Sequence, residues 1–429
     1  MLSLILIGAI IFAIAIFVYS LVSHRIEGSI VTAPMIFVGI GLLVSPEGLD
    51  AVAVGPGSPL ILIFAEIALV LILFSDAARI DFTTLKGNRS YPSRLLAIGL
   101  PLTIFAGAVT AIIFFTDIAL PEAALIGAIL APTDAGLGQV IVNSPKVPAR
   151  IRQALNVESG LNDGGAIPFF ALFLVLADAE KENIPAAQWI LFAAEQIGLG
   201  ILVGLIVGVL GGYLVNKAID KGLMRGRFQW IGFLALAIIS FVAADAVGGS
   251  GFIAAFVGGF ATTLTGRHVS ESIIEFTATG GEIFSLAVFF IFGVLAASLM
   301  SGITLVILIY AVLSLTLIRM LPVAISLLKT RLQPESVLFI GWFGPRGLAS
   351  IVLLLITLNE APGIPGLKTI AMVVSTTVLI SVFAHGITAK PAIDWYAAKI
   401  ASLPSDAPEL KEVVESPTRL NITVNPEND

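Results

Sequence analysis

The chain has 429 residues, of which 57% are hydrophobic and only 12% are charged, and its mean hydropathy is +1.03. A soluble globular protein is about 25% charged, so this composition excludes a soluble domain and indicates a polytopic membrane protein. The net charge is −6, and the absence of cysteine excludes disulfides, zinc–thiolate sites and iron–sulfur clusters.

The apolar segments are long enough to cross a bilayer. A transmembrane helix needs about 20 mostly apolar residues, and we count 13 candidates. The first lacks a basic flank and a small-residue cleavage site, so we expect it to be retained rather than removed as a signal peptide. The predicted spans are residues 3–22, 30–45, 59–75, 95–115, 119–143, 154–177, 190–216, 229–247, 251–265, 278–298, 302–322, 336–358 and 366–388.

The charges in the connecting loops predict the orientation. Odd-numbered loops carry most of the basic residues, among them Arg25, Lys146 and Lys217, whereas even-numbered loops carry only Lys181 and Lys368. Basic loops face the cytoplasm. We therefore expect a multi-pass protein of the cell (inner) membrane, surrounded by lipid, with the N-terminus outside and the C-terminus in the cytoplasm.

The last residues differ in composition from the rest. Residues 1–398 form the predicted transmembrane domain, and residues 399–429 are polar and rich in proline and acidic residues. Such a segment cannot bury an apolar core, so we expect a short, disordered cytoplasmic tail.

Two spans contain Gly and Pro at mid-membrane next to a charged residue. Span 5 reads IGAILAPTDAGL and span 12 reads IGWFGPRGLA. They are seven spans apart, an odd number, so they run in opposite directions. Interrupted spans at corresponding places in two halves are typical of inverted-repeat transporters. The predicted fold is therefore an all-α membrane protein of about 13 helices in which spans 5 and 12 are broken.

The acidic residue of span 5 lies at its interruption. A charge at the bilayer centre costs at least about 2.5 kcal/mol, so acids kept there usually face a partner or a watery path. Pro132 removes a backbone donor, which frees carbonyl oxygens near Thr133 beside Asp134. Carboxylate, hydroxyl and carbonyl oxygens are the ligands that a small hard cation prefers.

Span 6 supplies a second acid. Ser159 and Asp163 are four residues apart and share one helix face, while Glu158 and Asn162 share the adjoining face. Burial favours the protonated form of a carboxyl group, and a bound cation favours its charged form. A proton and a cation can therefore compete for Asp163, which is what an exchanger requires.

Arg346, in the GPRG of span 12, is the cation placed deepest in a predicted span, and it needs an anionic partner. Glu158 is our leading candidate, and this pair would join span 6 to span 12. Glu66 and Asp76 in and after span 3 are candidate pathway residues.

A different class of function has weaker support. The sequence GGSG at residues 248–251 fits the motif of intramembrane serine proteases, with Ser250 as nucleophile and His385, at the end of span 13, as base. This reading leaves Asp134, Asp163 and Arg346 unexplained. An ion channel is a further alternative, which would conduct ions without coupling to protons.

Three segments together resemble the NhaP/NHE branch of monovalent cation/proton antiporters. The segment from APTDAGLGQV to NVESGLNDGG is similar to the fifth and sixth spans of that branch, GWFGPRGLAS to its arginine-bearing late span, and GGSGFIAAFVGGF to its glycine-rich middle span. The similarity extends over residues 30–390.

The resemblance implies a mechanism and an assembly. Asp163 would be the proton- and cation-binding residue, with Na⁺ held by Asp163, Asp134, Ser159 and the Thr133 carbonyl. Asn162 would mark the branch, since related electrogenic exchangers have an aspartate there, and Glu158 and Arg346 would form a structural ion pair. The fold would be NhaA-like, with a core of about 95–177 and 302–388 moving against a dimerisation panel of about 1–75 and 190–298 in a homodimer.

Our hypothesis is thus a secondary-active, electroneutral sodium/proton antiporter that works by alternating access and is not an enzyme. Potassium/proton exchange at the same site is the alternative. We expect no cofactor beyond the transported cation and proton, and no nucleic-acid partner.

Overall fold

The structure is a computed structural model. It describes residues 2–26, 29–53, 55, 58–79, 90–182, 186–265, 271–404, 406–411 and 413.

The described residues are folded as helices and connecting turns. Ten helical stretches in them are long and apolar enough to cross a membrane, and three shorter apolar helices accompany them. The all-α polytopic class is confirmed, and the count of 13 spans stays a prediction. The longer helices are α1 (Leu2–Ile26), α2 (Ala33–Val44), α3 (Pro59–Ala78), α6 (Leu100–Phe114), α7 (Leu120–Leu130), α8 (Ala135–Val142), α9 (Ala149–Glu182), α10 (Ala186–Asp220), α11 (Arg227–Asp245), α12 (Gly251–Thr262), α13 (Glu271–Leu299), α14 (Leu305–Leu315), α15 (Leu317–Ser326), α16 (Pro334–Trp342), α17 (Leu348–Glu360) and α18 (Leu367–Ile400).

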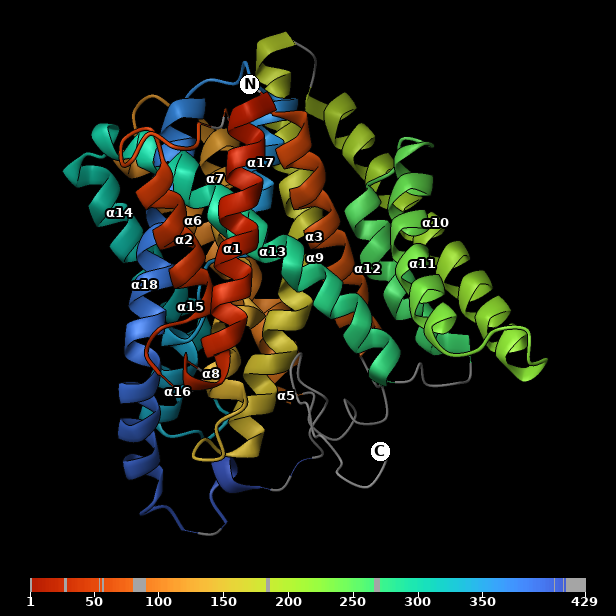
Figure 1. The fold of residues 1–429 in the computed structure, drawn as a ribbon. Coiled ribbons are helices and arrows are strands. Elements are labelled where there is room, and N and C mark those ends of the chain that lie inside the picture. Colours follow the sequence, from red (N-terminus) through yellow and green to blue (C-terminus); the bar gives the residue numbers. More distant parts are fainter. Residues whose placement is uncertain are drawn as a thin grey trace.

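The first and the last long helix mark opposite ends of the helical body (Figure 1). Helix α1 begins at the top of this view, and α18 ends at the bottom. The short helix α5 (Ser90–Arg94), which precedes α6, also lies at the bottom. We call this lower end the basic end, because Arg94, Lys146 and Arg150 belong to segments that meet there.

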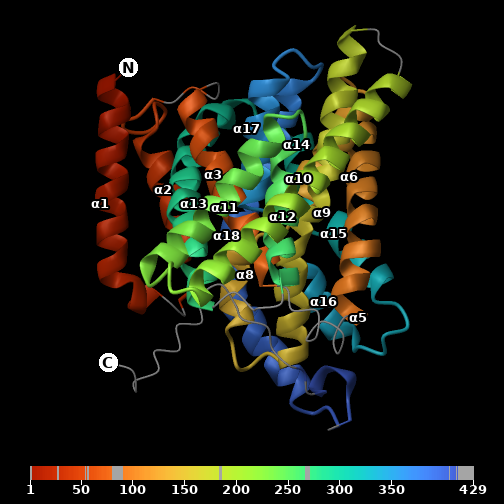
Figure 2. The ribbon, with the colours of Figure 1, turned by 90° about the vertical axis from the view of Figure 1, so that its right-hand side faces the viewer.

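The helices pack in two groups. Helices α2, α3 and α10–α13 pack mainly on one another, and α6–α9 together with α14–α18 form a second group whose members pack mainly among themselves. Figure 2 shows α1 at one edge of the molecule and α6 near the opposite edge. These groups resemble the predicted panel and core, whose division and relative motion stay predictions.

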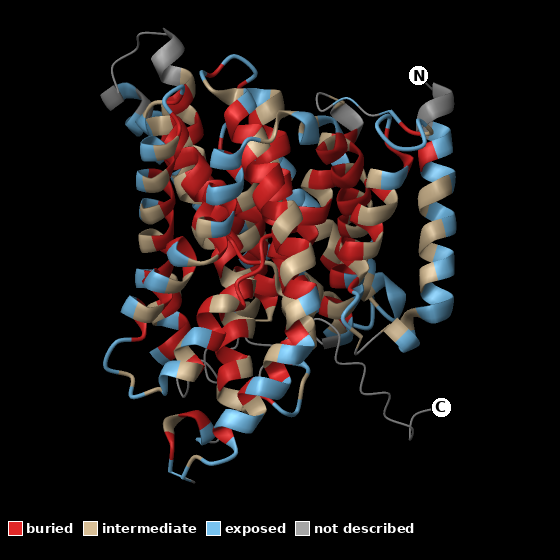
Figure 3. Cartoon of the chain, turned by 90° about the vertical axis from the view of Figure 1, so that its left-hand side faces the viewer, coloured by how far each residue is buried: buried red, intermediate tan, exposed pale blue. Residues whose placement is uncertain are grey.

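Burial follows the expected lipid exposure. The central helices are buried, whereas α1 stands at the rim with much of its surface exposed (Figure 3). Leu6, Phe17 and Leu21 of α1 are each more than 60% exposed. An outward apolar face of this kind is compatible with lipid and would be unfavourable in water.

Helix α18 is longer than expected. It runs past the predicted end at residue 388, through Pro391, to Ile400. The extension buries Tyr396, whose hydroxyl group lies 2.9 Å from the Ser336 Oγ and whose ring stacks on Phe339. This packing on α16 stabilises the part of α18 that lies beyond the apolar span. Hydropathy does not predict a helix there.

The prediction of a disordered tail is wrong for its first residues. Pro408–Leu410 form a 3₁₀ turn, and the Glu409 side chain is fully buried. Its Oε1 accepts hydrogen bonds from the Gln333 N–H at 2.7 Å and from the Ser336 hydroxyl at 3.0 Å. The carboxylate thereby holds the residues that follow α18 against the start of α16. Residues 414–429 lie outside the described residues.

Candidate functional site

The interruptions of spans 5 and 12 contact each other. Helix α7 ends at Leu130 and α8 begins at Ala135, while α16 ends at Trp342 and α17 begins at Leu348. The Asp134 N–H donates to the Pro345 carbonyl at 2.8 Å, joining the two non-helical segments. Half-helix ends therefore meet in the interior, where their unpaired backbone groups need partners from one another.

Asp134 caps two half-helices at once. Its Oδ1 accepts from the N–H groups of Gly136 and Leu137 at 2.7 and 3.1 Å, at the start of α8. Its Oδ2 accepts from the Leu348 N–H at 2.8 Å, at the start of α17. Since helix N-termini carry partial positive charge, one carboxylate complements both. A carboxylate has about four acceptor positions, so this arrangement leaves room for one further ligand contact.

The second glycine of GPRG is required by this close approach. A Cβ on Gly347 would collide with the Asp134 carboxyl group. We therefore expect Gly347→Ala to displace the carboxylate and to lower both thermal stability and transport. Gly39→Ala in α2 is the control, because nothing lies within 4 Å of a Cβ there. A Gly347→Ala protein that matched Gly39→Ala in melting temperature and transport would contradict this account.

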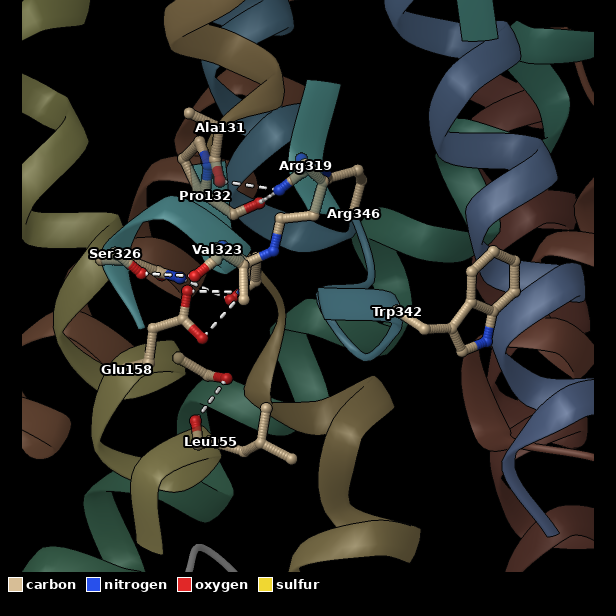
Figure 4. Close-up of polar contacts among 12 residues, drawn as sticks. Ala131, Pro132, Leu155, Glu158, Arg319, Val323, Ser326, Trp342 and Arg346 are labelled. Atoms are coloured by element: carbon tan, nitrogen blue, oxygen red, sulfur yellow. Dashed lines mark hydrogen bonds and ion pairs between the residues drawn. The ribbon is translucent and has the colours of Figure 1, made fainter. Parts of the chain in front are cut away.

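Glu158 pairs with Arg319, not with Arg346. The Arg319 Nη2 lies 2.6 Å from one Glu158 oxygen and 2.8 Å from the other, and each side chain is 2% exposed (Figure 4). The expected pair was therefore wrong. Arg319 is on α15, and this helix, not the break in span 12, presents a guanidinium group to the Glu158 side of α9.

Arg346 instead stabilises the end of α7. Its Nη1 donates to the carbonyl oxygens of Ala131 and Pro132 at 2.7 and 3.2 Å, and its backbone N–H donates to the Ser381 Oγ at 2.6 Å (Figure 4). A cation at a helix C-terminus complements the negative end of the dipole. Asp134 and Arg346 thus provide opposite charges at the two half-helix ends of span 5.

Three of the predicted cation ligands and Asn162 are buried around the break in span 5. Exposure is 1% for Thr133 and Asn162, 6% for Ser159 and 7% for Asp163. The Asn162 Nδ2 donates to the Thr133 Oγ1, which joins α9 to the break. Among the described residues the Asn162 Oδ1 is buried and has no hydrogen-bond partner.

The Ser159 hydroxyl is oriented by its own helix. It donates to the Leu155 carbonyl at 2.8 Å. The hydroxyl proton is therefore already used in a hydrogen bond, and the lone pairs of the oxygen are free to act as acceptors. Such a hydroxyl suits a cation better than an anion.

The two candidate pathway residues lie in different surroundings. Asp76 is 8% exposed, and its carboxyl group lies against Gly160 on α9, one residue from Ser159. Glu66 is half-buried on α3 and interacts electrostatically with Glu360 and Asp245 at the ends of α17 and α11. The structure thus brings Asp76, and not Glu66, next to the residues of span 6.

A cavity of about 160 Å³ reaches Asp134. Its walls come from α1, α2 and α13 on one side and from α8 and α17 on the other, so it lies between the two helix groups. Gln139, Glu282 and Ser285 add polar groups to its lining. Glu282 could not be assigned to this cavity from the sequence, because the sequence does not show which helix faces which.

Ser250 and His385 have separate structural roles. The Ser250 Oγ accepts from the Ile253 N–H as the N-cap of α12. His385 is 2% exposed, within 3.1 Å of the Ser381 hydroxyl and 2.9 Å of the Trp342 carbonyl. It therefore lies in the interior, where it links α18 to the end of α16, and these contacts give no support to a protease pair.

Within the described residues, no group of three or more His, Asp and Glu side chains is arranged to hold a metal ion. A cation at this site would depend on two carboxylates supplemented by hydroxyl and carbonyl oxygens. Oxygen donors of this kind suit a hard cation better than a soft transition metal.

Comparison with known proteins shows the family. The sequence model of a family described as "Sodium/hydrogen exchanger, transmembrane" matches residues 11–395. The chain is 25% identical over 418 residues to the K(+)/H(+) antiporter NhaP2 of Shewanella sp. (strain MR-4), covering 96% of this chain and 70% of the relative. It is 26% identical over 424 residues to the K(+)/H(+) antiporter NhaP of Alkalimonas amylolytica, covering 96% and 71%.

A solved structure has the same fold. The sodium proton antiporter MjNhaP1 from Methanocaldococcus jannaschii, at pH 8, superimposes with a TM-score of 0.71 at 20% identity, covering 93% of this chain and all of that one. The match of the family model over nearly the whole chain, together with this fold, shows that the chain belongs to the sodium/hydrogen exchanger family, whose members are cation/proton antiporters and not enzymes.

Proposed function

We propose that the protein is an electroneutral sodium/proton antiporter in which Asp163 carries either one proton or one sodium ion across the membrane. The observation that supports this most directly is the contact between Asn162 and Thr133. It brings the turn of α9 that bears Asp163 to the interruption where Asp134 lies. An acid on a continuous helix thereby adjoins the oxygen atoms of a broken one.

The proposed ligands are the Asp163 and Asp134 carboxylates, the Ser159 hydroxyl and the Thr133 carbonyl, with Asn162 beside them. A bare cation would satisfy the buried Asn162 Oδ1, which has no donor among the described residues. When Asp163 is protonated, its attraction for the cation is lost. Asn162 stays neutral in both states, so one cation exchanges for one proton and no net charge crosses.

Alternating access would follow from motion between the two helix groups. The cavity that reaches Asp134 lies between these groups, where such motion would change its shape. We propose that the core moves against the panel, that the protein is a homodimer of the inner membrane, and that the basic end faces the cytoplasm. We also propose that the halves of the chain that contain spans 5 and 12 form an inverted repeat.

Potassium/proton exchange is the second candidate. Both curated relatives quoted above are described as K(+)/H(+) antiporters, at 25–26% identity to this chain. Selectivity between Na⁺ and K⁺ depends on the size and rigidity of the oxygen cage. The residues proposed as ligands are the same for both ions.

Proteoliposomes distinguish these proposals. With the purified protein and an imposed pH gradient, we expect Na⁺ to dissipate the gradient, and we expect valinomycin with equal K⁺ on both sides to leave the rate unchanged. A rate that followed the membrane potential would overturn electroneutrality. Dissipation by K⁺ and not by Na⁺ would select the second candidate, and a conductive flux without proton movement would indicate a channel.

Competition for one carboxylate has a measurable consequence. Below the pH at which Asp163 is half protonated in the empty site, each unit of acidification should raise the apparent KM for Na⁺ about tenfold, because one proton must leave for each ion bound. Initial exchange rates over a series of pH values test this. An apparent KM independent of pH would show that proton and cation bind at separate groups.

A further inference from the structure

The basic end contains a second cavity, remote from Asp134 and Asp163 in its lining. Its volume is about 710 Å³. Four segments form the walls, namely α5, the start of α9, the connection between α15 and α16, and the residues that follow α18. The charged lining residues are Arg94, Arg150, Lys329, Arg331, Asp406 and Lys411.

The lining is strongly positive. Five of these side chains are cationic, namely Arg94, Arg150, Lys329, Arg331 and Lys411, and Asp406 is the one acid. Basic loop residues are expected at a cytoplasmic face. That rule does not explain why they converge from four separate segments on one open pocket. Like charges so placed repel one another, and Asp406 and the Glu409 carboxylate beside Gln333 are fewer than the five cations.

Two of the arginines are fixed by the fold. Arg94 donates to the carbonyl oxygens of Ser326 and Leu328 at 3.3 and 2.9 Å. Arg150 donates to the Pro408 carbonyl at 2.9 Å and lies over the Tyr91 ring, 4.5 Å from its centre. Its Nε is buried and has no hydrogen-bond partner among the described residues. Backbone carbonyl groups therefore hold both guanidinium groups in fixed positions.

The connection between α15 and α16 is held in an uncommon conformation. Lys329 and Arg331 have φ values of 65° and 63°, in the left-handed region that residues other than glycine rarely adopt. Strain of this kind tends to occur at ligand-binding positions. Here it occurs at two cationic residues of the same cavity lining.

We infer that this cavity binds a phosphate-bearing anion, either the headgroup of an anionic phospholipid or a soluble phosphate compound. Arginine and lysine side chains converging from several helices are suited to a phosphate group. Leu328, beside Lys329, is 61% exposed, and Leu410, beside Lys411, is 38% exposed. Apolar side chains at the rim of a basic cavity, where α15 leaves its span, match the acyl chains that adjoin a lipid headgroup.

Binding there would also hold the tail. Pro404, Asp406, Pro408 and Lys411 form one wall of the cavity, and Arg150 links this wall to α9. An anion between Lys411 and Arg331 would join the segment after α18 to the connection before α16. This site does not depend on the proposed transport mechanism.

Thermal melting of the full-length protein tests the inference. The protein is reconstituted in nanodiscs of phosphatidylcholine, and its melting temperature is measured as phosphatidylglycerol replaces part of the lipid. In a second arm, inorganic phosphate is added to phosphatidylcholine discs, with sodium chloride at matched ionic strength as the reference. We expect stabilisation in at least one arm, and native mass spectrometry to count the retained phosphatidylglycerol.

The variant pair isolates the cavity. Lys329→Gln with Arg331→Gln should lower the affinity of the protein for the stabilising anion about tenfold or more. Each basic side chain at a membrane surface adds to the attraction for an anion. The control, Lys221→Gln with Arg225→Gln, removes two exposed charges from the connection after α10 and should behave as wild type.

Each outcome has a meaning. Stabilisation by phosphatidylglycerol alone identifies a lipid headgroup, and stabilisation by inorganic phosphate identifies a soluble phosphate compound. Absence of stabilisation in both arms, or equal loss in both double variants, overturns the inference.

Discussion

Asp163→Asn should reduce cation/proton exchange to the level of protein-free liposomes. The amide has nearly the same shape as the carboxyl group, and it can neither release a proton at physiological pH nor offer a negative charge to a cation. Asp163 is 7% exposed, so a substitution of the same size should leave the packing of α9 intact. The measurement is gradient dissipation in proteoliposomes, with the melting temperature recorded for the same preparation.

Asp50→Asn is the matched control for this experiment. Asp50 is exposed, and its φ of 52° is a conformation that asparagine adopts readily. We expect wild-type transport and stability from it. A folded Asp163→Asn protein that exchanged at the wild-type rate would refute the assignment of the shared site.

Arg319→Met should cause the largest loss of stability. It leaves the Glu158 charge in a place where its side chain is 2% exposed. Removing one partner of a buried ion pair typically costs about 3–5 kcal/mol. The apparent melting temperature of the purified protein should therefore fall well below that of Arg227→Met, which removes an exposed arginine at the start of α11.

A second substitution separates the pair from simple loss of packing. Glu158→Met together with Arg319→Met removes both charges, so most of the lost stability should return, because no unpaired ion is then buried. Adding Glu158→Met to Arg346→Met should give no recovery over Arg346→Met alone, since Arg346 binds carbonyl groups at the end of α7 and not Glu158. Recovery with Arg346 and not with Arg319 would restore our original pairing.

The span pattern could be read from the sequence because it depends on local chemistry. An apolar run of sufficient length predicts a helix wherever it lies in the chain, and Pro132 predicts a break by its missing N–H. The same reasoning singled out Asp134, Thr133, Ser159 and Asn162, and of these Thr133 and Asn162 are buried in contact with each other in the structure.

Features that depend on which helices face each other could not be predicted. Arg319 was visible as a charge inside a span, but only the folded position of α15 brings its side chain to Glu158. The burial of His385 and Glu409 likewise depends on contacts between distant helices. The segment of high hydropathy ends before the helix does, so hydropathy gave no indication that α18 continues to Ile400.

The double cap at Asp134 affects biogenesis. Asp134 leaves the ribosome 214 residues before Leu348, whose N–H its Oδ2 accepts. Until the second half of the polypeptide has been inserted, this oxygen and the carbonyl groups that Arg346 will bind must rely on water or lipid headgroups. A chain truncated before span 12 should therefore leave span 5 poorly integrated and exposed to quality-control proteases, however hydrophobic that span is.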